Sequence, residues 1–257
     1  MRICFLNPFG TSDYDQLIQD VVEPSMRADV DLEVRHLDVR PANIDYYASK
    51  HLVEVGVMKA AVQAERDGFD AFVIGCCYDP GLTQARELVS IPVVAPLEAS
   101  LALVRPFGHR YAIVTDHHKA VPEIEDRVRL YGQEPNCKGV TSVGWFIDDM
   151  IVDPDAVASD AYETSVRVMH ETGAETVIIG CTIVSACYER AASAGDERMR
   201  SLSVINPNLM AVKQAEILAD LAAQGQYRIS RAGYYQNLAA HSETQAAELN
   251  LILAARS

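Results

Sequence analysis

The sequence has no apolar run long enough to cross a bilayer, and Met1 leads directly into a strand-like segment. A membrane-spanning helix needs about 20 consecutive apolar residues. A secretory signal needs a basic start followed by an apolar stretch. Neither pattern occurs, so we expect a cytoplasmic protein without a membrane partner.

Positive charge is also scarce. The 257 residues contain 22 Lys and Arg against 36 Asp and Glu, which gives a formal net charge of −14. Nucleic acids and anionic membrane surfaces bind basic patches. We therefore expect no nucleic-acid partner, whereas a small-molecule substrate remains open because local groups shape its site.

Several catalytic and metal-binding motifs are missing. There is no glycine-rich phosphate loop, no G-x-S-x-G and no H-E-x-x-H. The six cysteines lack both the paired spacing of zinc sites and the density of a disulfide-rich secreted domain. We expect reduced thiols, no cofactor and no metal. These cysteines are Cys4, Cys76, Cys77, Cys137, Cys181 and Cys187.

Two short stretches are near-copies of each other. Residues 70–77 read DAFVIGCC and residues 175–182 read ETVIIGCT. Each is a short apolar run rich in β-branched residues, which is typical of a strand buried on both faces. Each ends in Gly-Cys ahead of a helical pattern, and open α/β sheets place their ligands at such strand ends.

The rest of the chain repeats an α/β pattern in two halves. Besides the two Gly-Cys strands, apolar runs predict strands over residues 2–8, 31–36, 91–96, 110–115, 140–146 and 202–207. Helical patterns occupy residues 14–26, 50–68, 80–89, 119–131, 154–173, 210–223 and 244–255, with a further helix after residue 181. Asp79-Pro80 and Asp153-Pro154 each read as an N-cap followed by proline at the first helical position.

Three strand ends correspond between the halves. Asn7 matches Thr115, Cys76 matches Cys181, and Pro96 matches Pro207. This correspondence predicts an α/β protein of two pseudo-symmetric domains, each a mostly parallel sheet flanked by helices, with the site in the cleft between them. Residues 1–96 with 208–257 would form the first domain, and residues 97–207 the second.

Two thiols facing one cleft suggest proton transfer. A helix N-terminus lowers the pKa of a thiol, and Cys76 and Cys181 each precede a predicted helix. One thiolate and one thiol on opposite sides of a carbon can remove a proton from one face and deliver another to the opposite face, which is racemisation without a cofactor. Two alternatives remain: a cysteine nucleophile that opens a ring or isomerises an alkene, and a ligand-binding protein with no catalysis.

Several motifs resemble the Asp/Glu/hydantoin racemase superfamily, most closely its hydantoin and allantoin racemase branch. The resemblance runs from Arg2 to about Tyr235, and Cys-x-x-Asp-Pro-Gly at residues 76–81 is its most specific part. It is also carried by Asn7-Pro8, by residues 108–115, by residues 173–181 and by residues 230–234.

The resemblance implies racemisation of a five-membered cyclic ureide by two catalytic cysteines, which fall on Cys76 and Cys181. It also implies a homo-oligomer. The substrate-binding groups of the family would fall on Asn7, Tyr47, Cys77, Tyr78, Thr115 and Thr182, and the loop with Ile44, Tyr46 and Tyr47 would form the side-chain pocket.

Two sequence features depart from that family pattern or lie outside it. After the first cysteine this chain has Cys77-Tyr78, where hydantoin racemases commonly carry Phe-Gly or Phe-Ser. After the second cysteine it has Thr182-Ile183, where they commonly carry Ala-Gly, and Gly-Cys-Thr is closer to amino-acid racemases.

Asp116-His117-His118 follows a predicted strand, and we expect it to be a solvated loop and helix cap rather than a metal site.

Overall fold

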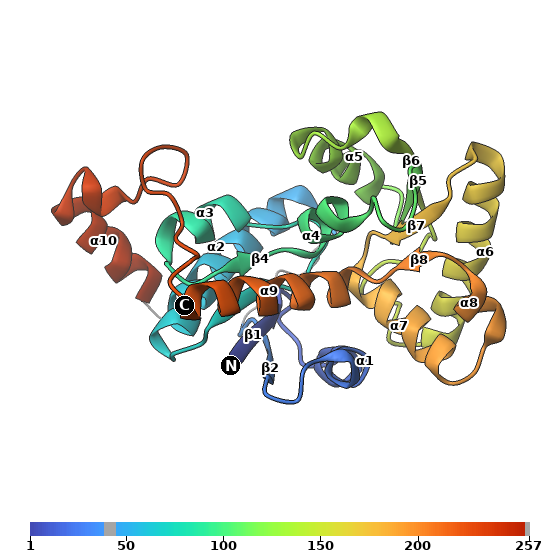
Figure 1. Ribbon diagram of the computed structural model, residues 1–257, viewed down its shortest axis with the longest axis horizontal. Coiled ribbons are helices and arrows are strands. Elements are labelled where there is room, and N and C mark those ends of the chain that lie inside the picture. The colour runs from blue at the N-terminus through green and yellow to red at the C-terminus, as the bar shows by residue number, and fades with distance from the viewer. Residues whose placement is uncertain (39–44, 255–257) are drawn as a thin grey trace.

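Two parallel four-stranded sheets form the framework of the protein (Figure 1). The structure is a computed structural model, and it describes residues 1–38 and 45–254. The first sheet has the order β2-β1-β3-β4, with β1 at Arg2–Asn7, β2 at Asp31–His36, β3 at Ala71–Ile74 and β4 at Val93–Val94. The second has the order β6-β5-β7-β8, with β5 at Tyr111–Thr115, β6 at Cys137–Ser142, β7 at Thr176–Ile179 and β8 at Val204–Ile205. The predicted α/β fold with two parallel sheets is confirmed.

The same strand order in both sheets places the two Gly-Cys strands in equivalent positions. β3 lies between β1 and β4, and β7 lies between β5 and β8. Every residue of β3 and of β7 is buried, because helices cover both faces of each sheet. The continuous apolar runs that predicted these strands are the consequence of that two-sided burial.

Helices connect successive parallel strands, as crossover connections require. They are α1 (Asp15–Val22), α2 (Tyr47–Arg66), α3 (Leu82–Leu88), α4 (Pro96–Leu103), α5 (Ala120–Leu130), α6 (Pro154–Thr172), α7 (Thr182–Ser193), α8 (Glu197–Ser201), α9 (Pro207–Ala223) and α10 (Glu243–Ala254). Short 3-10 turns lie at Glu23–Ser25, Glu134–Asn136 and Leu238–Ala240. No described helix is long and apolar enough to span a membrane.

α6 begins and ends at the capping residues that the local sequence predicts. The Asp153 carboxylate accepts the backbone N–H of Ala156, Pro154 opens α6, and Gly173 closes it with φ +67°, as predicted.

The start of α3 differs from the prediction. Asp79 does not cap this helix: α3 begins at Leu82 after Gly81, which has φ +69°. The Asp79 carboxylate instead accepts the backbone N–H groups of Leu97 (3.1 Å) and Glu98 (2.9 Å) and so caps α4. A cap reached through space replaces the local one, because the loop after β3 folds over the start of α4.

α9 returns the chain from the second sheet to the first. It follows β8, yet it packs on β1, β3 and β4 and also lies against α4, its counterpart after β4 (Figure 1). Ala211, Val212, Ala215 and Ala219 belong to the same buried cluster as the residues of β1 and β3. α9 therefore packs on the first sheet, whereas the division into domains at residues 96/97 and 207/208 stays a prediction.

Candidate active site

Each candidate cysteine follows a glycine at the carboxyl end of a central strand. A Cβ atom at Gly75 would lie 2.3 Å from Cε1 of Phe5 and 2.6 Å from the backbone oxygen of Leu6. A Cβ atom at Gly180 would lie 2.6 Å from Cγ2 of Ile113. The two glycines are therefore required by close packing against the neighbouring strand, β1 or β5. Each glycine lies directly before the turn that carries the thiol, where the backbone passes close to its neighbour.

Cys76 and Cys181 line the same pocket, which lies between the two sheets. Each side chain is buried, with 8% of Cys76 and 7% of Cys181 exposed. The pocket is open to solvent, and its empty space amounts to about 610 Å³ with the solvent at its mouth counted. Its walls are Pro8, Phe9, Asp45, Lys50, Val53, Glu54, Cys76, Cys77, Tyr78, Pro80, Asp116, Glu123, Arg127, Ile147, Gly180, Cys181 and Thr182.

Three of the predicted substrate-binding residues are among those walls. They are Cys77, Tyr78 and Thr182. The Thr182 hydroxyl donates to the backbone oxygen of Gly75 at 3.0 Å, so it also ties the start of α7 to the end of β3. This bond holds the two Gly-Cys turns against each other.

Among the residues that the structure describes, Asn7, Thr115 and Tyr47 do not line this pocket. The Asn7 amide donates to Asp15 (2.6 Å), and the Thr115 hydroxyl lies 3.0 Å from both Asp116 Oδ1 and the backbone oxygen of Gly180. Tyr47 opens α2, is half exposed, and its hydroxyl lies 3.5 Å from the backbone oxygen of Lys119. Their substrate contacts stay predictions. Ile44 lies outside the described residues, and Tyr46 is half exposed.

The Asp116-His117 segment is buried, so the expectation of a solvated loop is wrong for these two residues. Asp116 is 4% exposed and His117 is fully buried; only His118 faces solvent. Asp116 accepts a hydrogen bond from the Tyr78 hydroxyl (3.0 Å), and the His117 ring stacks on Phe146 at 4.6 Å between centroids.

One cluster in the described part of the chain has the ligand atoms for a metal ion. Oxygen and nitrogen atoms of Asp45, Asp116 and His117 lie within 4.8 Å of one another, and Nε2 of His117 is 3.3 Å from Oδ1 of Asp45. Asp116 already accepts hydrogen bonds from the Tyr78 hydroxyl and the backbone N–H of His117. The cluster is thus also explained as a hydrogen-bond network supporting Tyr78.

Sequence reasoning missed a charged pair at the pocket. The Lys50 ammonium of α2 lies 2.5 Å from Oε2 of Glu123 on α5, so this ion pair joins elements from the two halves. The same ammonium lies 3.5 Å from the centroid of the Tyr78 ring. No local motif marks Lys50, because a lysine on a helix ordinarily faces solvent.

The pKa of each cysteine is raised, which contradicts the expectation that helix N-termini lower it. Burial raises the pKa of Cys76 to about 12, although the Tyr78 backbone N–H and the Lys50 charge oppose it. Cys76 is also followed by a turn, and α3 begins only at Leu82.

Cys181 directly precedes α7. Even so, burial, followed by the nearby Asp116 carboxylate, raises the pKa of Cys181 against the opposing backbone N–H groups of Val184 and Ile183. Desolvation outweighs the helix terminus at both sites.

Known proteins resemble this chain over most of its length. The profile of the family described as Asp/Glu/Hydantoin racemase matches residues 3–215. A hydantoin racemase of Pseudomonas sp. (strain NS671) is 30% identical over 221 residues, covering 86% of this chain and 87% of that protein.

Two solved structures share the fold. An allantoin racemase from Klebsiella pneumoniae superposes with a TM-score of 0.81 at 22% identity, covering 92% of this chain and 93% of that one. An allantoin racemase from Pseudomonas fluorescens superposes with a TM-score of 0.80 at 24% identity, covering 92% and 97%.

Proposed function

We propose, starting from the fact that the chain belongs to the Asp/Glu/hydantoin racemase family, that it is a cofactor-independent racemase of a hydantoin-like or allantoin-like cyclic ureide. The observation that carries the proposal is the pair of thiols, Cys76 and Cys181, at equivalent strand ends on the walls of one pocket. The family's relatives named above are hydantoin and allantoin racemases, which are isomerases.

In the proposed reaction the two thiols exchange roles. A Cys76 thiolate takes the proton from the ring carbon that carries the substituent, and the Cys181 thiol donates its proton to the opposite face of the same carbon. Cys76 ends as the thiol and Cys181 as the thiolate, so no other reactant is consumed. Developing negative charge on the ring carbonyl would be favoured by the N-terminus of α7, which meets the pocket at Thr182.

The charges around the pocket favour a neutral ring over a dicarboxylate. Four carboxylates line it, from Asp45, Glu54, Asp116 and Glu123, against two cations, Lys50 and Arg127. Like charges disfavour an anionic substrate. A cyclic ureide therefore fits these walls better than aspartate, glutamate or maleate does, which ranks the amino-acid racemase and maleate-isomerase alternatives lower.

A cysteine nucleophile is the second candidate function. The adjacency of two thiols supports it as well, but a nucleophile needs a substantial thiolate population. Burial raises the pKa of both thiols, and this lowers the thiolate population for nucleophilic attack and for proton removal alike. The racemases among the relatives named above are therefore the reason for ranking nucleophilic attack second. A covalent adduct mass on Cys76 after incubation with substrate would favour this second function.

The test is racemisation itself, followed by optical rotation and by uptake of solvent deuterium at the ring carbon. The substrate panel is chiral 5-substituted hydantoins, allantoin, aspartate, glutamate and maleate. Cys76→Ser and Cys181→Ser should each lower the rate about 10²–10⁴-fold, the usual worth of one acid or base. Cys137→Ser, a half-buried cysteine of β6 outside the pocket, is the matched control and should keep full activity.

A double Cys76→Ser, Cys181→Ser variant that still racemises would refute the mechanism. Activity on aspartate or glutamate but on no ureide would move the substrate class to amino acids. The proposal also includes a cytoplasmic homo-oligomer, which light scattering of the purified protein and cell fractionation would test.

A further inference from the structure

The two candidate thiols have different charged neighbours although the strands that carry them are equivalent. The groups that act on Cys76 come from α2, α5, the end of β5, the start of α7 and its own turn: they are Lys50, Glu123, Asp116, Cys181, Cys77 and Tyr78. The leading influences on Cys181 other than burial are the Asp116 carboxylate, the Cys76 thiol and two backbone N–H groups. A cation, Lys50, is therefore among the groups that most affect the pKa of Cys76, and no cation is among those that most affect the pKa of Cys181.

Lys50 is held firmly in this position. Its side chain is 11% exposed, its ammonium is 2.5 Å from Glu123, and the same ammonium stands 3.5 Å from the centre of the Tyr78 ring. The backbone N–H of Tyr78 and the Lys50 charge both lower the pKa of the Cys76 thiol. Lys50, Tyr78 and Cys76 also line the same pocket, so the ammonium and the sulfur face one space.

We propose that Lys50 is a positioning residue of the reaction proposed above: its ammonium, seated over Tyr78, places the thiolate of the resting pair on Cys76 and leaves the proton on Cys181. The inference rests on the proposed function for its catalytic meaning. Its electrostatic content concerns the two thiols alone and is measurable without any substrate.

Glu123 makes the proposal sharply testable. It neutralises part of the Lys50 charge, so removing it should have the opposite effect on Cys76 from removing Lys50. A purely structural role of the ion pair, as a strap between α2 and α5, predicts instead that both substitutions loosen the pocket in the same way. The direction of change therefore separates the electrostatic role from the structural one.

The experiment measures alkylation of Cys76 and Cys181 by iodoacetamide in the same sample, with peptide mass spectrometry giving the ratio of the two rates. A pKa change of one unit alters the thiolate fraction about tenfold and the intrinsic nucleophilicity about threefold in the opposite sense, so the rate changes about threefold. In the unaltered protein Cys76 should react faster than Cys181. Lys50→Met should lower the Cys76/Cys181 ratio about threefold, and Glu123→Gln should raise it by about the same factor.

Two further variants complete the design. Lys50→Arg keeps the charge and should keep the ratio. Lys59→Met removes a lysine of the same helix that does not line the pocket, and should also leave the ratio unchanged.

A ratio that moves the same way in Lys50→Met and Glu123→Gln, or in neither, overturns the proposal. If no cyclic ureide is racemised while the two ratios still move in opposite directions, the proposed function fails and the electrostatic asymmetry stands. The two failures are therefore distinguishable.

Discussion

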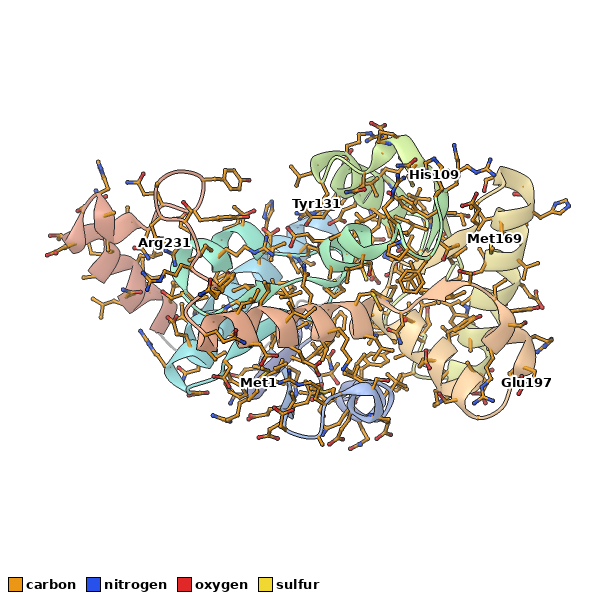
Figure 2. All side chains as sticks on the ribbon, in the orientation of Figure 1. Met1, His109, Tyr131, Met169, Glu197 and Arg231 are labelled. Atoms are coloured by element: carbon orange, nitrogen blue, oxygen red, sulfur yellow. The ribbon has the colours of Figure 1, made fainter. Side chains whose placement is uncertain are left out.

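The carboxyl of Asp79 should make the protein less stable as the pH rises from 5 to 8. This side chain is fully buried, and it accepts hydrogen bonds from Leu97, from Glu98 and from the hydroxyl of Tyr131 at 2.7 Å. Tyr131, labelled in Figure 2, directly follows α5, so its hydrogen bond to the carboxyl joins the start of α4 to the end of α5. Burial raises the pKa of Asp79 from 3.8 to about 7, even though all three hydrogen bonds favour the charged form.

The sign follows from where the proton is held more tightly. The folded state binds the Asp79 proton more strongly than the unfolded state does, so this contribution is complete below pH 3.8 and is lost as the pH rises through 7. At ~1.36 kcal/mol per pKa unit, the free energy of unfolding should fall by about 2.5 kcal/mol between pH 5 and pH 8 through this group.

Asp79→Asn isolates that contribution, because an amide of the same size does not titrate. At pH 5 the variant should be less stable by about 1–3 kcal/mol, since its NH₂ group cannot accept the hydrogen bonds that the carboxyl accepts. The difference should shrink by about 2.5 kcal/mol on going to pH 8. Urea unfolding of both proteins at pH 5, 6, 7 and 8 measures it.

Asp153→Asn is the control, because Asp153 caps α6 at an exposed position. Aspartate and asparagine are about equally good N-caps, so this change should stay within about 0.5 kcal/mol at each pH. A stability difference between the unaltered protein and Asp79→Asn that grows with pH would refute the reasoning. It would mean that the helix terminus and the hydrogen bonds outweigh burial and that the ionised form is the stable one.

Three other predictions concern the strand ends, the first thiol and the tail. Gly75→Ala should lower the free energy of unfolding by about 1–3 kcal/mol. The loss should exceed that of Gly180→Ala, because a Cβ at Gly75 meets the backbone oxygen of Leu6, whereas a Cβ at Gly180 meets only a methyl group at such short range. Thermal unfolding of the two variants compares them. Alkylation of Cys76 should keep accelerating with pH beyond 9, since its pKa is raised to about 12, and a plateau near pH 9 in a stopped-flow series would contradict this. Arg231, in the segment between α9 and α10 (Figure 2), donates to backbone carbonyls at and just after the end of α3. Arg231→Ala should therefore speed hydrogen exchange of residues 226–242 while leaving racemisation intact; unchanged exchange would show that other contacts hold this segment.

Strand positions and the thiol pair were predictable because their causes are local. A run such as Phe72-Val73-Ile74 is apolar at every position because both faces of the strand are covered. The unbroken apolar run can be read directly from the sequence. The repetition of Gly-Cys at Cys76 and Cys181 then pointed to one shared pocket.

What the sequence could not predict depends on partners that are distant along the chain. Asp79 reads as a cap for the nearest helix, but its carboxylate caps α4 because the chain folds back over it. In the sequence Lys50 resembles a surface lysine, because its partners Glu123 and Tyr78 are far from it along the chain. The raised pKa of each thiol likewise depends on how much protein covers the sulfur, which no spacing of residues encodes.

The return of α9 to the first sheet has a consequence for synthesis on the ribosome. The strands of the first sheet are made first, but part of their apolar cover, at Ala211, Val212, Ala215 and Ala219, is made only after β8. The second sheet is continuous in the chain, so it is complete before the first one is covered. A nascent chain that pauses before residue 207 should therefore hold one finished sheet and one exposed apolar face, the state in which it most needs a chaperone.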